Sequence, residues 1–195
     1  MIDSYYRTPY QTICVDPFVV FLARRNLHPI HLTLAALVFG MIIIPLLMYG
    51  FVWTAIASLL TSGYLDTLDG SLARLRNQTS QTGAALDILT DRIVEFSVVL
   101  GLFFVDPPHR GLLCLLMLGS ILTCVTSFLV VGIFTANDSE KSFHYSPGIM
   151  ERAEAFLFFL LMIALPSLFP FLAITFTLLV FTTAAIRMKE FIRSP

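Results

Sequence analysis

Three long apolar runs constrain this chain more than any other feature of its sequence. LTLAALVFGMIIIPLLMYGFVW fills residues 32–53, IVEFSVVLGLFFV fills 93–105, and AFLFFLLMIALPSLFPFLAITFTLLVF fills 155–181. A helix that crosses the hydrocarbon core of a bilayer needs about 20 mostly apolar residues. Only 13% of the 195 residues are charged, where soluble domains carry about 25%. The sequence therefore predicts an all-α integral membrane protein.

The interruptions of the apolar pattern divide the chain into six expected transmembrane helices. The breaks are Gly50, the turn from Asn77 to Gly83, and the segments DPPHRG, ANDSEKSFHYSPG and LPSLFP. We place the six spans, with ends uncertain by a few residues, near 31–52, 54–75, 83–105, 111–135, 150–166 and 169–189. We expect insertion without a cleaved signal peptide, because charged residues and prolines precede the first apolar stretch.

A short amphipathic helix is expected before the first span. In DPFVVFLARRN, Phe18, Phe21 and Leu22 share one face at helical spacing, and Arg24 and Arg25 follow them. This pattern is typical of a helix that lies in the membrane interface. We therefore expect one membrane domain over residues 1–195, with an interfacial N-terminal segment over 1–29 and a six-helix transmembrane bundle over 30–195.

The basic residues predict how the chain is oriented. With the N-terminus inside, eleven of the 12 Lys and Arg residues lie at the cytoplasmic side, and Arg110 lies at the other side. Cytoplasmic segments of membrane proteins carry the excess of Lys and Arg. We expect a bacterial cytoplasmic membrane with both termini facing the cytoplasm. The net charge of −1 gives no reason to expect a nucleic-acid partner.

Four aspartates fall within the second and third expected spans. Asp66 and Asp69 are three residues apart, and Asp87 and Asp91 are four apart, so each pair shares one face of its helix. The short turn between the spans makes them antiparallel neighbours, which brings both pairs toward a common space near the cytoplasmic side. A charge at the bilayer centre costs about 2.5–3.5 kcal/mol even on insertion scales. Clustered carboxylates therefore need protonation or cations, and all-oxygen ligands favour Mg2+ or Mn2+.

Several alternatives stay open at this point. LDTLDGS could be a loop between spans, or the aspartates could form buried ion pairs with Arg74 or Arg92. A cation or proton transporter could also use intramembrane aspartates, although such proteins show inverted halves or broken helices. An intramembrane aspartyl protease would need a Gly-x-Gly-Asp segment, which the sequence lacks.

Residues 66–91, as they stand, resemble the signature of the CDP-alcohol phosphotransferase (CDP-alcohol phosphatidyltransferase) family. That signature reads D-x2-D-G-x2-A-R-x8-G-x3-D-x3-D. Every fixed position is filled at the required spacing, by Asp66, Asp69, Gly70, Ala73, Arg74, Gly83, Asp87 and Asp91. One departure lies before the first span, where Ile30 follows Pro29 and family members often have asparagine. Any polar contact made by that asparagine must be missing here or be supplied by His31, Thr33 or water.

The resemblance implies an enzyme of phospholipid biosynthesis. It would transfer the phosphatidyl group of CDP-diacylglycerol to the hydroxyl of a small polar alcohol and release CMP. It implies two Mg2+ or Mn2+ ions, bound by Asp66, Asp69, Asp87 and Asp91, with Asp91 also taking the proton of the acceptor hydroxyl. The nucleotide would contact Asp66, Asp69, Gly70, Ala73 and Arg74. Arg152 and Arg187 would bind an acceptor phosphate. The remaining expected partners are membrane lipid and a second copy of the chain, with which it would form a homodimer.

The identity of the acceptor is less constrained. We expect a phosphorylated alcohol, inositol phosphate or glycerol 3-phosphate, and serine and free inositol remain alternatives. Arg92 in LDILTDR resembles inositol-phosphate members, but the fourth span lacks the lysine that some of them place there. Glu95 could support the metal site or pair with Arg92. His144 could touch the acceptor or be a solvated loop residue.

Overall fold

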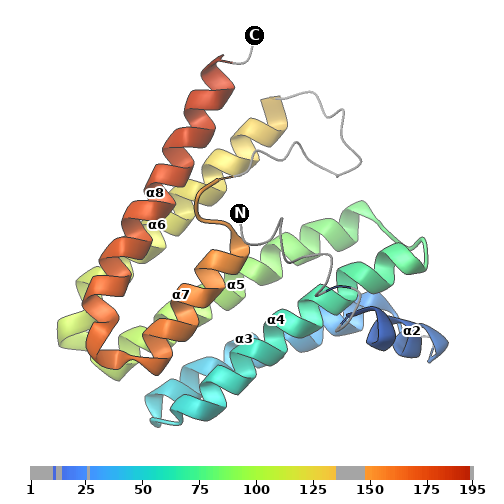
Figure 1. Cartoon of the computed structure of the whole chain (residues 1–195), viewed down its shortest axis with the longest axis horizontal. Helices are drawn as coiled ribbons and strands as arrows, with labels where there is room; N and C mark the ends of the chain where they lie inside the picture. Colours follow the sequence, from blue (N-terminus) through green and yellow to red (C-terminus); the bar gives the residue numbers. More distant parts are fainter. Residues whose placement is uncertain (1–10, 12–14, 26, 135–147, 194–195) are drawn as a thin grey trace. The chain divides into compact units, whose positions relative to one another are not determined.

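A computed structural model describes residues 11, 15–25, 27–134 and 148–193 (Figure 1). The described residues form seven α-helices and one 3-10 turn, with no strand among them. In chain order these are α2 (Asp16–Arg24), α3 (Pro29–Met48), α4 (Val52–Leu75), α5 (Gln81–Val105), α6 (Pro107–Phe134), α7 (Arg152–Ala164), η2 (Pro166–Leu168) and α8 (Phe169–Arg193). The all-α prediction is confirmed. Arg7 and Lys141, two of the eleven basic residues predicted at the cytoplasmic side, and His144 lie outside the described residues.

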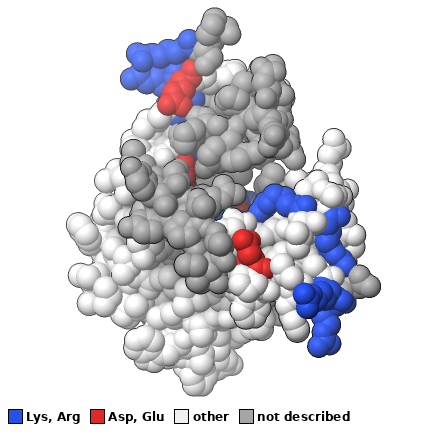
Figure 2. Space-filling view, turned by 45° about the vertical axis from the view of Figure 1, so that its right-hand side comes forward, with Lys and Arg blue, Asp and Glu red and all other residues white. Residues whose placement is uncertain are grey.

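Three helical segments in the described part of the chain are long and apolar enough to cross a membrane. They are Pro29–Met48, Pro107–Phe134 and Pro166–Arg193. Figure 2 agrees with this composition, because charged side chains take up little of the described surface on the face that it shows. The chain is thus an integral membrane protein. Helices α4 and α5 are long but carry the charged residues of the signature, and α7 has 13 residues.

The helix ends follow local chemistry. Gly50 and Asn77 have left-handed backbones, with φ of 75° and 53°, and each ends the helix before it, α3 and α4 respectively. Ser80 begins α5 earlier than expected, because its Oγ accepts a hydrogen bond of 3.0 Å from the backbone N–H of Gly83. DPPHRG was predicted to be a connection, but α6 already begins at Pro107. Proline suits that first helical position because it has no N–H to satisfy.

The chain divides into two compact units, Ile2–Val105 and Asp106–Pro195. In the first unit α3 packs against both α4 and α5, and α2 packs against α4. In the second unit α8 packs against α6 and α7.

Small and hydroxyl-bearing residues let the helices of the first unit approach closely. A Cβ on Gly40 of α3 would lie 2.4 Å from Cγ2 of Val94 on α5. Between α3 and α4, Ser58 Oγ donates to the carbonyl of Phe39 at 2.8 Å, and Ser62 Oγ donates to that of Ala36 at 2.7 Å. Membrane helices associate through such small residues and interhelical hydrogen bonds.

Helix α2 forms where the sequence predicted a short helix, but Leu22 packs on the buried side and does not share the exposed face of Phe18 and Phe21. Its Val19 is buried in a cluster with Leu68 and Leu72 of α4. Its other face leaves Phe18 and Phe21 more than half exposed. The guanidinium of Arg76, just after α4, donates to the carbonyls of Ala23 and Leu27 at 3.1 and 2.8 Å. Arg76 therefore ties the end of α2 to α4.

The second unit has its own polar contacts. Thr183 of α8 is fully buried, and its Oγ1 accepts a hydrogen bond of 2.9 Å from the backbone N–H of Met150. Arg110 of α6 is also buried, with its guanidinium carbon 4.3 Å from the ring centre of Phe169. At the corner before α6, a hydrogen bond from His109 lowers the pKa of the Asp106 carboxyl from its ordinary value.

Candidate metal centre

Three of the four aspartates of α4 and α5 come together. The short turn predicted these two helices to be packed neighbours, but each packs mainly against α3 and they make little contact with each other. One carboxylate oxygen from each of Asp66, Asp69 and Asp87 lies within 4.8 Å of the others. Asp69 is buried, and the other two are half-buried. Helix α4 is continuous through LDTLDGS, so the alternative that this segment is a loop is wrong. We call these three residues the carboxylate cluster.

The carboxylate cluster fits a hard divalent cation. Two ligand oxygens on opposite sides of Mg2+ are about 4.2 Å apart, twice the usual metal–oxygen distance. Adjacent ligands of the same ion are only about 3.0 Å apart, so oxygens within 4.8 Å of one another could share one ion after side-chain rotations that bring some of them closer by up to about 2 Å. Carboxylates without nitrogen or sulfur ligands favour Mg2+, Mn2+ or Ca2+ over softer metals. A cation would also offset the repulsion among three neighbouring negative charges.

A hydroxyl from a third helix reaches the cluster. Thr33 of α3 donates a hydrogen bond from its Oγ1 to Oδ2 of Asp69, and both side chains are buried. Sequence reasoning predicted Thr33 only as one of several groups that could supply the contact of the missing asparagine. The signal in the sequence that pointed to Thr33 was its position four residues after Pro29.

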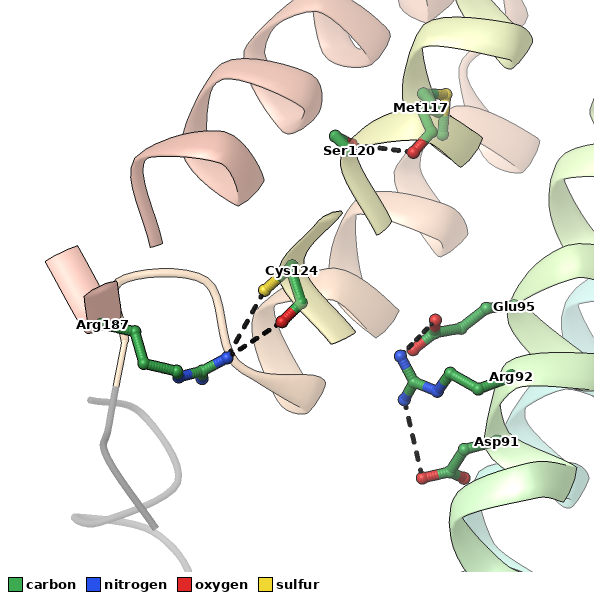
Figure 3. A network of polar contacts seen from close by, with 7 residues as sticks. All are labelled: Asp91, Arg92, Glu95, Met117, Ser120, Cys124 and Arg187. Atoms are coloured by element: carbon green, nitrogen blue, oxygen red, sulfur yellow. Dashed lines mark hydrogen bonds and ion pairs between the residues drawn. The ribbon is translucent and has the colours of Figure 1, made fainter. Parts of the chain in front are cut away.

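Asp91 lies one turn beyond Asp87 on α5 and is not one of the three residues of the carboxylate cluster. Its Oδ2 is 3.8 Å from Nη2 of Arg92, whose Nη1 lies 2.7 Å from Oε2 of Glu95 (Figure 3). Glu95 therefore pairs with Arg92, which was one of its two expected roles. The arginine links two carboxylates on one face of α5.

The remaining signature residues of α4 leave a polar, uncrowded surface. Arg74 is exposed, and its Nη2 donates to Oγ of Ser71 at 3.1 Å. A Cβ added to Gly70 would meet only Nη1 of Arg74, at 3.5 Å. Ala73, which lies between Gly70 and Arg74 in the sequence, is half-buried. The cationic end of Arg74 is thus accessible to an anionic ligand, and the nucleotide contacts stay predictions.

The two predicted acceptor-binding arginines belong to the second unit. Arg187 of α8 is buried, and its Nη1 donates to the carbonyl of Cys124 at 3.2 Å (Figure 3). Its guanidinium carbon also lies 5.4 Å from the ring centre of Phe128. Arg152 begins α7 and is exposed. Their role in binding an acceptor stays a prediction.

The sequence of the chain is similar to those of known proteins. A family model described as CDP-alcohol phosphatidyltransferase matches residues 26–187. The chain is 30% identical over 155 residues to the inner membrane protein YnjF of Escherichia coli (strain K12), covering 76% of this chain and 75% of that protein. It is 25% identical over 161 residues to phosphatidylinositol phosphate synthase of Corynebacterium glutamicum, covering 79% and 70% of the two chains.

Solved structures give the same fold. The phosphatidylinositol phosphate synthase of Mycobacterium tuberculosis (PgsA1), crystallised with CDP-DAG bound, aligns with a TM-score of 0.74 at 22% identity. The alignment covers 92% of this chain and 94% of that one. At this identity the likeness concerns the fold alone, but the family match spans most of the chain and includes the whole signature. The chain belongs to the CDP-alcohol phosphatidyltransferase family and is an enzyme of that family.

Proposed function

We propose that this enzyme transfers the phosphatidyl group of CDP-diacylglycerol to the hydroxyl of a small phosphorylated alcohol and releases CMP. The observation that carries the proposal is the carboxylate cluster, which lies within the matched part of this family. A relative of the same fold was crystallised with CDP-DAG, the proposed donor.

The proposed cofactor is Mg2+ or Mn2+, as two ions. A second structure of the M. tuberculosis enzyme contains manganese and citrate, and it aligns with a TM-score of 0.75 at 21% identity. Asp66, Asp69 and Asp87 would hold the first ion, and Asp91, one turn from Asp87, would help to hold the second. Divalent ions in such a site neutralise the diphosphate and align its oxygens for displacement.

The chain's own groups then have distinct tasks. In the proposed step the acceptor oxygen bonds to the phosphorus of the phosphatidyl group. The bond from that phosphorus to the oxygen of CMP breaks, and the acceptor proton passes to Asp91. The exposed guanidinium of Arg74 can form two parallel hydrogen bonds to a phosphate. Gly70 and Ala73 leave room for the nucleotide to approach the backbone of α4.

Inositol phosphate is the first acceptor to test. The C. glutamicum and M. tuberculosis relatives are both phosphatidylinositol phosphate synthases by name. Arg152 and Arg187 are the proposed contacts for the acceptor phosphate. Glycerol 3-phosphate comes next, and serine and free inositol test the requirement for a phosphate.

The proposed membrane arrangement has six crossings, α3 to α8, with both termini and the signature at the cytoplasmic side. The exposed phenylalanines of α2 would then enter the inner leaflet. A membrane-impermeant maleimide applied to intact cells should label Trp53→Cys, in the exposed α3–α4 corner. It should label Gln78→Cys only after lysis. The reverse result would overturn the orientation.

The catalytic proposal is tested with the purified full chain in nanodiscs that contain CDP-diacylglycerol. CMP release is measured with each acceptor, with Mn2+, with Mg2+ and with EDTA. Asp87→Asn should abolish release, whereas Asp106→Asn, which changes a half-buried carboxyl of the other unit, should leave it unchanged. Release that persists in EDTA, or that is equally lost in both variants, would contradict the metal centre.

A further inference from the structure

The hydroxyl of Thr33 makes a buried contact between two helices at the edge of the carboxylate cluster. Only 6% of Thr33 and 6% of Asp69 are exposed, so water has little access to compete for their hydrogen bond. The hydroxyl proton has one other acceptor nearby, the carbonyl of Pro29 at 3.4 Å. The carboxylate is the nearer and the charged one, and hydrogen bonds to charged acceptors are about twice as strong as neutral ones.

The direction of this hydrogen bond distinguishes it from others between α3 and α4. Ser58 and Ser62 lie on α4 and donate to backbone carbonyls of α3, which holds the helices together without involving a functional group. Thr33 lies on α3 and donates to a side-chain carboxylate of α4. A hydrogen bond that served only helix packing would not need to end on one of the three clustered aspartates.

We propose that Thr33 is a positioning residue for the metal ligand Asp69, an inference that rests on the proposed metal centre. A carboxylate has two oxygens, and a hydrogen bond to Oδ2 fixes its rotation about the last side-chain bond. Asp69 then presents its carboxylate to the ion in one orientation, without loss of rotamer freedom when the ion binds. Groups that orient metal ligands in this way typically contribute 10- to 100-fold in metal affinity or activity.

The test measures Mn2+ binding to the purified full chain, by the loss of the free-ion signal in electron paramagnetic resonance. Thr33→Val keeps the shape but removes the donor, and should weaken Mn2+ binding about 10- to 100-fold. Thr33→Ser keeps the hydroxyl and should stay within about threefold of the original chain. Ser58→Ala removes a hydrogen bond of the same helix pair, about two turns from Asp66, and should leave Mn2+ binding unchanged.

The kinetics of CMP release should also show weaker Mn2+ binding when the hydroxyl of Thr33 is removed. For Thr33→Val, the Mn2+ concentration for half-maximal CMP release should rise, while kcat at saturating Mn2+ should stay near the original value. Thr33→Ala provides a second removal of the hydroxyl in case the valine variant does not purify as a folded protein.

Two outcomes would overturn the inference alone: unchanged Mn2+ binding in Thr33→Val and Thr33→Ala, or equal weakening in Ser58→Ala. If the original chain binds Mn2+ no better than Asp66→Asn does, the metal centre itself fails, and this inference fails with it.

Discussion

Replacing Gly40 by alanine should force α3 and α5 apart. A Cβ at this position would lie 2.4, 3.0 and 3.1 Å from Cγ2, Cγ1 and Cβ of Val94. Carbon atoms in favourable contact are about 3.5–4.0 Å apart, so the closest pair would overlap by more than 1 Å. A β-branched side chain has little freedom to turn away. The helices, and not a flexible side-chain end, would have to move.

The size of the effect follows from comparison with Gly119. A Cβ at Gly119 of α6 would meet nothing within 4 Å, so Gly119→Ala changes helix propensity without crowding a neighbour. Alanine is favoured over glycine inside a helix by about 1 kcal/mol, and this gain is common to both variants. Overpacking costs about 1–3 kcal/mol, and this cost applies only to Gly40→Ala. At about 2–4 °C per kcal/mol for a chain of this size, Gly40→Ala should melt about 2–12 °C below Gly119→Ala.

The assay is thermal unfolding of the full chain in one detergent. Unfolding is monitored by the labelling of Cys114, a buried thiol that reacts once the chain unfolds. Val94→Ala removes both Cγ atoms and leaves only the 3.1 Å contact, so the double variant with Gly40→Ala should be more stable than the sum of the single effects predicts. A coupling of about 0.5–3 kcal/mol is usual for residues in contact. Equal melting temperatures for Gly40→Ala and Gly119→Ala, or strict additivity with Val94→Ala, would refute the close approach.

Three further substitutions test other contacts. Asp91→Asn should abolish CMP release and leave binding of CDP-diacylglycerol largely intact, and equal loss of both would show that Asp91 acts as a ligand and not as a base. Arg187→Ala should raise KM for a phosphorylated acceptor more than tenfold, because a charge-assisted hydrogen bond contributes about 1.5–3 kcal/mol. An unchanged KM would leave this buried arginine with a packing role beside Cys124. Arg76→Met should speed proteolysis between α2 and α3, since it removes both hydrogen bonds to Ala23 and Leu27, and an unchanged cleavage rate would show that apolar packing alone holds α2.

The carboxylate cluster was predictable because its geometry depends on local rules. Asp66 and Asp69 are brought to one face by helical periodicity, and the short turn after α4 returns the chain so that Asp87 of α5 comes back to the same level, although both helices pack against α3 and little against each other. Neither step needs knowledge of side-chain packing. The helix ends were less predictable, because a single cap, such as the Ser80 hydroxyl, moves a boundary by two residues.

The contacts around the cluster could not be derived in the same way. Thr33 lies 36 residues from Asp69, and its hydroxyl could equally have returned to its own helix, as that of Thr177 does to the carbonyl of Ala173. Which acceptor it reaches depends on the separation and rotation of α3 and α4, and these are set by serines and glycines elsewhere along the same helices. A sequence pattern therefore identifies the clustered aspartates but not the hydroxyl that contacts one of them. The hydrogen bond from Thr33 to Asp69 thus depends on how closely the helices around α3 pack. Gly40→Ala perturbs that packing, and Thr33→Val removes the hydrogen bond that the packing makes possible.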